Sequence, residues 1–319
     1  MRAWRSSAPG VRVAKWGAVA ALLILLFYGA LGLAVTTVLI GDHARWRGMS
    51  RGPADFGLQA ETVSFRTSDG VLLRAWWLPS VGPARGSIVI AHGIEHTRQV
   101  MLPRAAFLVN AGYNVLTPDL RGHGESGGSV VSPGFLEARD LLAAERFVRE
   151  RARNVPVAVL GLSYGAVAAL LAAGQSTGFA AVIADGAFPT GRAVYGRVLD
   201  RFAHAPQTSF WMRAAGAVAS APGVVRAISL AFFARTGIDL GPDFVSVVAD
   251  APRVRAPVLL ISGSDDWMVP PADARLLQAA LRNTKATVVI IPHGRHDTTY
   301  STAPAIYEAA VLSFLTRVL

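Results

Sequence analysis

The chain predicts an α/β fold built on a mostly parallel, doubly wound sheet. Short apolar runs at residues 87–91, 113–117, 156–160 and 179–184 alternate with stretches that favour helix. The run at 87–91 is continuous, as expected of a strand that is covered on both faces. Strict alternation of strand and helix is typical of a parallel sheet wrapped by helices.

The remaining elements follow the same rhythm. Residues 61–66 and 71–78 form a predicted N-terminal hairpin, because Asp69-Gly70 between them is a good turn signal. Two further strands are predicted at 258–261 and 286–291, and helices at 98–111, 135–151, 164–173, 272–281 and 306–318. Together these elements make a predicted domain over residues 59–319.

The alternation stops for residues 188–241. This stretch carries no strand signal and reads as two or three short helices, broken at Pro206, Pro222-Gly223 and Gly237. An insertion at this point of a parallel sheet lies over the carboxyl ends of the strands, where ligands bind. We therefore predict a helical lid.

The N-terminal segment predicts a membrane anchor. No residue is charged from Trp16 to Gly41. A helix over residues 18–40 would reach roughly 34 Å, enough to cross a hydrocarbon core of about 30 Å. The apolar run is too long for a cleaved signal peptide, and no clear cleavage site follows it. We predict a basic segment at 1–15, an uncleaved transmembrane signal anchor at 16–41 and a linker at 42–58.

The charges that flank this anchor predict its orientation. Arg2, Arg5, Arg12 and Lys15 precede the anchor, and Arg45, Arg47 and Arg51 follow it, partly offset by Asp42. The slight excess of positive charge before the anchor places the N-terminus inside. The domain at 59–319 is then expected on the extracytoplasmic side of the cell membrane.

The overall composition limits the chemistry of the chain and the kinds of partner that it can bind. The formal net charge is +10, from 31 Lys and Arg against 21 Asp and Glu, and the chain has no cysteine. Disulfides, thiolate catalysis and cysteine metal sites are therefore excluded. A basic balance can indicate nucleic acid, an anionic membrane or acidic substrates. Because the chain has neither a lysine-rich tail nor an aromatic–basic RNA motif, we expect no nucleic-acid partner.

The pentapeptide Gly161-Leu162-Ser163-Tyr164-Gly165 is the strongest chemical signal. It lies between the strand at 156–160 and an alanine-rich helical run. This is the context of a G-x-S-x-G nucleophile elbow, in which a sharp strand-to-helix turn pushes the serine hydroxyl into a cleft. The flanking glycines avoid collisions of a Cβ with the neighbouring strand and helix. Ser163 is the predicted nucleophile.

A serine nucleophile needs a histidine base. His296 lies in the loop after the last predicted strand, where a C-terminal base could reach the elbow. His293 is the competitor, but its place nearer the strand end suits a supporting residue better. His296 is therefore the predicted base.

The base in turn needs a carboxylate to orient it. Asp266 follows the strand at 258–261 in the register Gly-x-x-Asp-x-x-Val-Pro, and we predict that it is the acid. Asp265 and Asp185 are the alternatives, the latter because the acid can follow an earlier strand. The order Ser163, Asp266, His296 is the Ser…Asp…His order of one hydrolase fold.

With these residues in place, residues 60–319 resemble an α/β-hydrolase. Two further segments are similar to that family: Ala91-His92-Gly93-Ile94, like its His-Gly segment, and the run from Asp119 to Ser126, like its D-x-R-G-x-G-x-S loop. The likeness is greatest to bacterial membrane-anchored hydrolases of the serine aminopeptidase and monoglyceride-lipase-like type. Hormone-sensitive-lipase-like esterases fit worse, because there is no His-Gly-Gly-Gly run.

The resemblance implies an oxyanion hole. Its donors would be the backbone N–H groups of Ile94 and Tyr164, with His92, Gly93, Gly161 and Gly165 in supporting positions. Tyr164 stands where the family commonly has methionine, leucine or glutamine, a change that keeps the backbone donor. Removal of one such donor typically costs on the order of 100- to 1,000-fold in rate.

Two other motifs point to different chemistry. His92-Gly93-Ile94-Glu95-His96 matches the H-x-x-E-H zinc motif, but that motif requires a helix, and here it follows a strand. The glycines at 122–128 are not followed by Gly-Lys-Ser/Thr, so a phosphate loop is not predicted. We expect neither a metal nor a cofactor.

The predicted function is that of a serine hydrolase. It would cleave a carboxylic ester or thioester through an acyl-enzyme. The lid is rich in arginine and aromatic residues, which would suit a small acyl substrate, including a lipid with an anionic head group. A peptidase or amidase of the aminopeptidase type is one alternative, and a non-catalytic, membrane-tethered binding module is another. The sequence predicts no oligomeric state.

Overall fold

A computed structural model describes residues 9–41, 48–204, 209–210, 213 and 223–319 of the chain. Several predictions fall on residues outside this part. They are the basic segment up to residue 8, the linker from 42 to 47 with its charges, and the helix breaks at Pro206 and Pro222. The predictions for the remaining elements can be compared with the structure directly.

The sheet has eight strands in the order β1-β2-β4-β3-β5-β6-β7-β8. These are β1 (Glu61–Arg66), β2 (Leu72–Leu78), β3 (Gly86–Ala91), β4 (Tyr113–Pro118), β5 (Val157–Leu162), β6 (Phe179–Asp185), β7 (Val258–Gly263) and β8 (Ala286–Ile291). The hairpin of β1 and β2 pairs antiparallel, and β2 also pairs antiparallel with β4. All other pairs are parallel, which confirms the predicted mostly parallel sheet.

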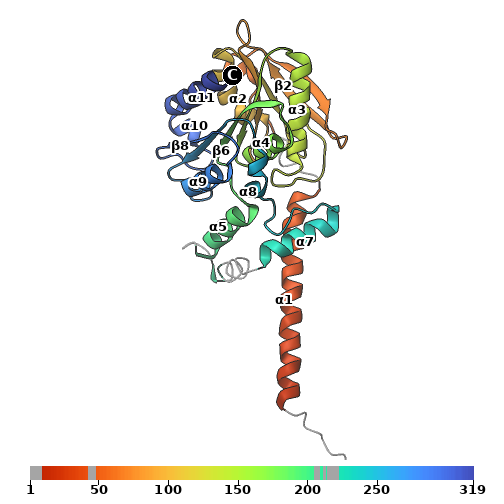
Figure 1. Cartoon of the computed structure of the whole chain (residues 1–319). Coiled ribbons are helices and arrows are strands. Elements are labelled where there is room, and N and C mark those ends of the chain that lie inside the picture. The colour runs from red at the N-terminus through yellow and green to blue at the C-terminus, as the bar shows by residue number, and fades with distance from the viewer. Residues whose placement is uncertain (1–8, 42–47, 205–208, 211–212, 214–222) are drawn as a thin grey trace, which may run out of the picture.

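Helices cover both faces of the sheet (Figure 1). The helices α2 (Leu102–Asn110) and α11 (Pro304–Val318) lie on one face, and α3 (Glu137–Arg151), α4 (Tyr164–Gln175) and α9 (Pro271–Ala280) lie on the other. Alternate residues of one strand enter different cores: Ile88 and Ile90 face α2, whereas Val89 and Ala91 face α4. This period of two explains why the run at 87–91 is apolar at every position except its first.

Short elements were the hardest to predict. The predicted helix at 98–111 begins as the 3₁₀ turn η3 (Arg98–Met101) before α2. No helix was expected at α8 (Val247–Asp250), η4 (Ala251–Arg253) or α10 (Thr299–Thr302). Helices of three or four residues are too short to show a helical period.

The stretch between β6 and β7 contains the helices α5 (Gly191–His204) and α7 (Val224–Thr236). Gly223 and Gly237 bound α7, and both have the left-handed conformation, with φ of 97° and 70°. A residue without a Cβ adopts this conformation readily, so the two glycines set both ends of the helix. Figure 1 shows α5 and α7 at the end of the domain from which α1 extends.

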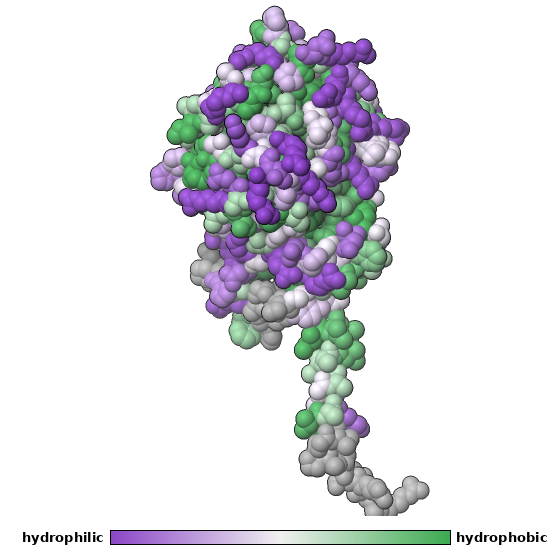
Figure 2. Space-filling model, viewed as in Figure 1, coloured by the Kyte–Doolittle hydropathy of each residue, from purple (hydrophilic) through white to green (hydrophobic). Residues whose placement is uncertain are grey.

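The N-terminal helix α1 (Pro9–Leu39) projects from the base of the domain as an apolar stalk (Figure 2). Val13–Thr37 is long and apolar enough to cross a membrane, and it is the one such helix within the described residues. The predicted segment began at 16 and ended at 41, so the helix starts earlier and stops sooner. Its end is fixed to the domain, because Gly41 N–H donates to Ser129 (2.7 Å) and Val131 N–H donates to Leu39 (2.8 Å).

Candidate active site

Ser163 lies at the turn between β5 and α4. Its backbone has φ 52° and ψ −115°, a conformation that residues with a side chain rarely adopt. Holding such a residue costs on the order of 1–3 kcal/mol, which the surroundings must offset. Part of that support comes from β6, because Ser163 N–H donates to the carbonyl of Asp185 at 2.7 Å.

The glycines on either side of Ser163 allow the turn to be this tight. A Cβ on Gly161 would overlap the carbonyl of Gly165, and a Cβ on Gly165 would lie 2.6 Å from the carbonyl oxygen of His92. Real Cβ atoms do not approach backbone this closely, so both positions require glycine. The G-x-S-x-G spacing therefore follows from close backbone packing between β3, β5 and α4.

Ser163, His296 and Asp266 form one chain of hydrogen bonds. Ser163 Oγ lies 2.7 Å from His296 Nε2, and His296 Nδ1 lies 2.8 Å from Asp266 Oδ2. The second oxygen of Asp266 accepts N–H groups from Met268 (2.9 Å) and Val269 (2.8 Å). The structure thus brings the three predicted residues together, although they are up to 133 positions apart in sequence.

The surroundings of His296 set its basicity. Burial alone would lower the pKa of this imidazole, but the hydrogen bond and the charge of Asp266 act against burial. The charges of Asp297 and Asp185 act in the same direction as Asp266, so the pKa of His296 is raised above its ordinary value of 6.5. A raised pKa makes the ring a stronger acceptor for the hydroxyl proton of Ser163.

The competing residues have other partners. Asp265 accepts the Ser264 hydroxyl at 2.7 Å, and His293 is exposed, 3.7 Å from Asp265. Asp185 is fully buried, but it pairs with Arg104 (3.0 Å) rather than with His296. None of the three takes part in the hydrogen-bond chain that ends at Ser163.

His92 holds the loop beside Ser163. The Leu120 N–H donates to His92 Nε2 at 3.0 Å, so the other ring nitrogen, Nδ1, carries the proton and donates to the Gly93 carbonyl at 2.7 Å. Burial lowers the pKa of His92 well below its ordinary value, consistent with a neutral ring. Because the carbonyl and the N–H of one trans peptide point in opposite directions, this bond also orients the Ile94 N–H.

Tyr164 supplies the second predicted backbone donor. It is the first residue of α4, and the first N–H groups of a helix have no partner within the helix. The Gly93 backbone approaches Ser163 so closely that a Cβ on Gly93 would lie 3.6 Å from that of Ser163. The backbone at Gly93 and the start of α4 therefore both lie next to Ser163.

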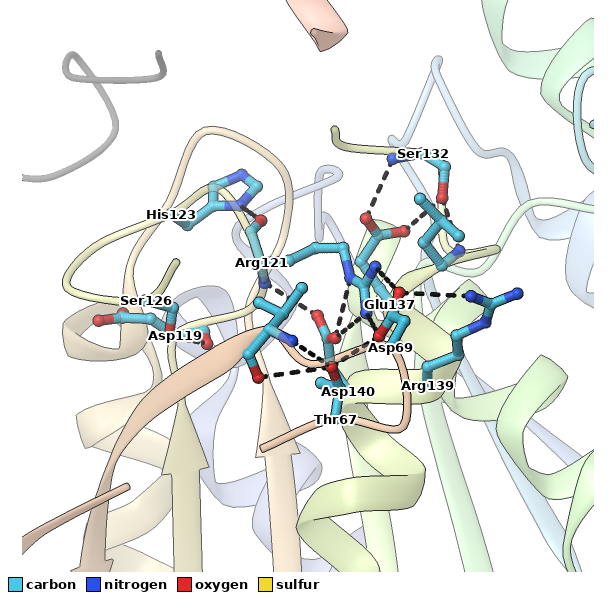
Figure 3. A network of polar contacts seen from close by, with 12 residues as sticks. Thr67, Asp69, Asp119, Arg121, His123, Ser126, Ser132, Glu137, Arg139 and Asp140 are labelled. Carbon is cyan, nitrogen blue, oxygen red and sulfur yellow. Dashed lines mark hydrogen bonds and ion pairs between the residues drawn. The ribbon is translucent and has the colours of Figure 1, made fainter. Parts of the chain in front are cut away.

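A buried ionic network supports the loop that holds His92 (Figure 3). Arg121 donates to Asp140 on α3 through Nε (2.9 Å) and Nη2 (2.7 Å), and to Asp69 in the hairpin turn at 2.8 Å. Its neighbour Leu120 is the residue that binds His92. The network thus connects the hairpin, α3 and the loop under the Ile94 peptide, which gives the D-x-R-G-x-G-x-S segment a structural role.

Sequence reasoning missed two residues around this site, Gly186 and Arg98. Gly186 backs the imidazole, since a Cβ there would lie 3.3 Å from His296 Cε1. Arg98 is buried, pairs with Asp119 at 2.9 Å, and stacks 4.4 Å from the ring centre of Trp76. The signal for Gly186 was its place directly after β6, whereas nothing in the sequence around Arg98 distinguishes a buried arginine from an exposed one.

Within the described residues, no group of three or more His, Asp or Glu side chains is arranged to hold a metal ion. His92, which begins the H-x-x-E-H motif, is in a loop, and its two ring nitrogens are used by Leu120 and Gly93. The site therefore offers a hydroxyl, an imidazole, a carboxylate and backbone N–H groups, a set suited to acyl transfer through a serine.

This arrangement on a sheet of this order defines an α/β-hydrolase. The family model described as Serine aminopeptidase, S33, matches residues 82–302, and the chain belongs to this family. The protein YqkD of Bacillus subtilis is 30% identical over 232 residues, which cover 72% of this chain and 70% of YqkD.

Solved structures show the same fold. An esterase of Pyrococcus furiosus, Pf2001, is similar with a TM-score of 0.68 and 24% identity, over 85% of this chain and 96% of the esterase. An acylaminoacyl peptidase of Pyrococcus horikoshii is similar with a TM-score of 0.57 and 18% identity, over 82% of this chain and 42% of the peptidase. The fold is therefore shared by an esterase and a peptidase.

Proposed function

We propose that the protein is a serine hydrolase that cleaves carboxylic esters or thioesters through an acyl-enzyme. The observation that carries the proposal is the unbroken hydrogen-bond chain from Ser163 through His296 to Asp266, with distances of 2.7 and 2.8 Å. Few arrangements other than nucleophile activation require a strained serine at one end and a buried carboxylate at the other.

Each residue has a defined part in the proposed reaction. His296 Nε2 accepts the proton as Ser163 Oγ attacks the acyl carbon, and Asp266 stabilises the imidazolium that forms. The Ile94 and Tyr164 N–H groups bind the oxyanion, and His296 then returns the proton to the leaving group. Water, activated by the same imidazole, attacks the acyl-enzyme and frees Ser163.

We favour an ester over a peptide as the substrate. The structurally similar Pf2001 is an esterase, and the chain covers 96% of it, against 42% of the acylaminoacyl peptidase. The arginine-rich lid also contains few carboxylates that could bind a peptide amino terminus. Four of its arginines already contact other parts of the chain: Arg192, Arg197, Arg201 and Arg235. We therefore do not base a lipid-like substrate on these arginines.

We further propose that α1 is an uncleaved anchor that holds the enzyme at a membrane, with the domain outside the cytoplasm. The part of α1 nearest the domain packs on α7, and Arg235 donates to Thr36 and Thr37 at 3.0 Å each. Cleavage of the segment would remove these contacts and leave the base of the domain uncovered. A lipid-like acyl substrate is consistent with a site located at that end of the domain.

Labelling with a fluorophosphonate probe tests the proposed nucleophile. We expect the full-length protein in detergent to be labelled, and Ser163→Ala to lose both labelling and hydrolysis of acyl esters. Ser262→Ala is the matched control, because Ser262 is also buried at the carboxyl end of a strand, β7, but lies outside the hydrogen-bond chain. Labelling of Ser163→Ala at the wild-type rate would contradict the proposal.

A substrate panel tests the proposed specificity. We expect acyl esters and thioesters of several chain lengths to be hydrolysed faster than aminoacyl amides of matched acyl size. Faster hydrolysis of the amides would favour a peptidase of the aminopeptidase type. A protein that neither labels nor turns over any member of the panel would favour the binding module.

A further inference from the structure

The lid helix α7 has three different faces. Its domain face is buried through Val224, Ile228 and Phe232. A second face meets α1 through Ala227, Ala231 and Arg235. The third face is exposed and consists of Arg226, Leu230, Phe233 and Ala234. On this third face Leu230 is 52% exposed and Phe233 50% exposed, which is unusual for large apolar side chains next to each other on a helix.

The contact between α7 and α1 is close and specific. A Cβ on Gly32 of α1 would lie 3.0 Å from both the Ala227 carbonyl oxygen and the Ala231 Cβ, so glycine allows the two helices to touch. Small residues at a helix crossing are typical of packing within membranes. The bonds from Arg235 to Thr36 and Thr37 fix the crossing at one height along α1.

The crossing of α1 and α7 lies at a depth that falls within the expected thickness of a bilayer. The apolar span begins near Trp16, and Gly32 follows sixteen residues later, or roughly 24 Å along a helix that rises about 1.5 Å per residue. A hydrocarbon core is about 30 Å thick, so the crossing would fall within its outer edge. From Val13 to Leu26, α1 is exposed along its whole surface, as expected of a segment surrounded by lipid.

The third face of α7 points toward the expected membrane. At 100° per residue, Leu230 and Phe233 lie on the opposite side of the helix from Ile228 and Phe232, which contact the domain. The exposed face therefore looks away from the domain, in the direction in which α1 extends (Figure 1). Arg226 lies one turn before Leu230, where its long side chain can reach the head groups.

We propose that this third face of α7 is a second membrane-contact surface, and that α1 sets its depth. Leu230 and Phe233 lie among the upper acyl carbons of one leaflet, and Arg226 pairs with lipid phosphates. The surface rests on the proposal that α1 crosses a membrane, but it is independent of the chemistry at Ser163. It makes the lid a part of the protein that the bilayer touches directly.

The absence of cysteine makes a direct test simple. The full chain carries one introduced cysteine, labelled with an environment-sensitive fluorophore, in vesicles of phosphatidylcholine and phosphatidylglycerol. Phe233→Cys probes the surface, Leu25→Cys probes the middle of the span, and Val81→Cys is the exposed control far from α1. Spin-labelled lipids with the quencher near the head group or deep in the chain report the depth of each position.

We expect quenchers near the head group to quench position 233 about twofold more than deep ones, since interfacial helices bury only about 5–10 Å deep. Position 25 shows the reverse order, and position 81 shows no quenching. Equal quenching at positions 233 and 81, with position 25 quenched, would contradict the proposed membrane contact of α7 but would still support the anchor. No quenching at 25 overturns both the anchor and the surface.

A matched pair of substitutions tests whether α1 sets the depth. Gly32→Leu would clash with Ala227 and Ala231, whereas a side chain at Gly29 on the same helix meets nothing within 4 Å. We expect Gly32→Leu to reduce quenching at 233 at least to half, and Gly29→Leu to leave it unchanged, with position 25 quenched in both. Unchanged quenching at 233 in Gly32→Leu would overturn the role of α1.

Discussion

Two buried aspartates lie at the carboxyl ends of neighbouring strands, and only one of them reaches the imidazole. Asp266 follows β7, binds His296 at 2.8 Å and accepts two backbone N–H groups. Asp185 ends β6, is fully buried, and binds Arg104 at 3.0 Å and the Thr299 hydroxyl at 2.8 Å. Similar position and similar burial thus lead to different partners.

The difference shows that the bonding partner of a buried carboxylate, rather than its position at a strand end, decides whether it can stabilise a charged imidazole. Burial raises the pKa of Asp185, and the charge of Arg104 together with hydrogen bonds from Thr299, Arg104 and Tyr307 offsets only part of that rise. Asp185 pairs with Arg104 and contributes less to the raised pKa of His296 than Asp266 does. Asp266 has no cation among its hydrogen-bond partners, so His296 is the group that its charge stabilises.

The largest expected effect is on catalysis through Asp266. Asp266→Asn should lower kcat/KM for an acyl ester by on the order of 10⁴-fold, because the amide neither fixes the ring tautomer nor stabilises the imidazolium. Steady-state kinetics on protein with unchanged circular dichroism checks this. A loss of less than tenfold would mean that Asp266 is not the acid.

Asp185→Asn should affect stability instead. Removing one partner of a buried ion pair leaves Arg104 uncompensated and costs about 3–5 kcal/mol. We expect a lower denaturant midpoint, with kcat/KM per folded molecule within about threefold of wild type. Arg253→Gln, which breaks an exposed pair with Asp250, is the control and should cost no more than about 1 kcal/mol. An intact midpoint in Asp185→Asn would show that the pair contributes little.

The pH dependence of kcat/KM tests the contact between Asp266 and His296. His296 must be neutral to accept the proton of Ser163, and its pKa is raised, so the acidic limb of kcat/KM should have its midpoint above 6.5. Asp266→Asn removes the main cause of the upward shift and should move the midpoint to lower pH. Profiles measured from pH 5 to 9 decide this, and a wild-type midpoint well below 6.5 would contradict it.

The smallest expected effect concerns α5, a helix of the predicted lid. Arg197 donates to the Met268 carbonyl at 2.7 Å and pairs with Asp273, so it holds the loop whose N–H groups bind Asp266. Arg197→Gln should lower kcat by roughly fivefold, corresponding to about 1 kcal/mol, with little change in KM. Arg192→Gln, on the same helix but paired with exposed Asp243, should leave kcat unchanged. Equal losses of kcat in the two variants would show that Arg197 has no specific role in holding the loop that binds Asp266.

Much of the site could be predicted because its local chemistry demands particular residues. The elbow needs glycine at 161 and 165 since any Cβ there would meet backbone, and that demand is visible in five letters. His296 and Asp266 were predicted from their loops after the last two strands. By contrast, the buried partners of Arg98 and Arg121 were not predicted, because a charged residue in a loop gives no local sign of burial.

The sequence by itself determined the alternating fold, the strained serine and the apolar N-terminal helix, since each depends on the order of residues over short distances. Only the tertiary structure decided between Asp266 and Asp185, and only it placed α7 against α1. Both outcomes depend on contacts between segments far apart in the chain. The physical reason is that hydrogen bonds and close helix packing act over a few ångströms in space, whatever the separation in sequence.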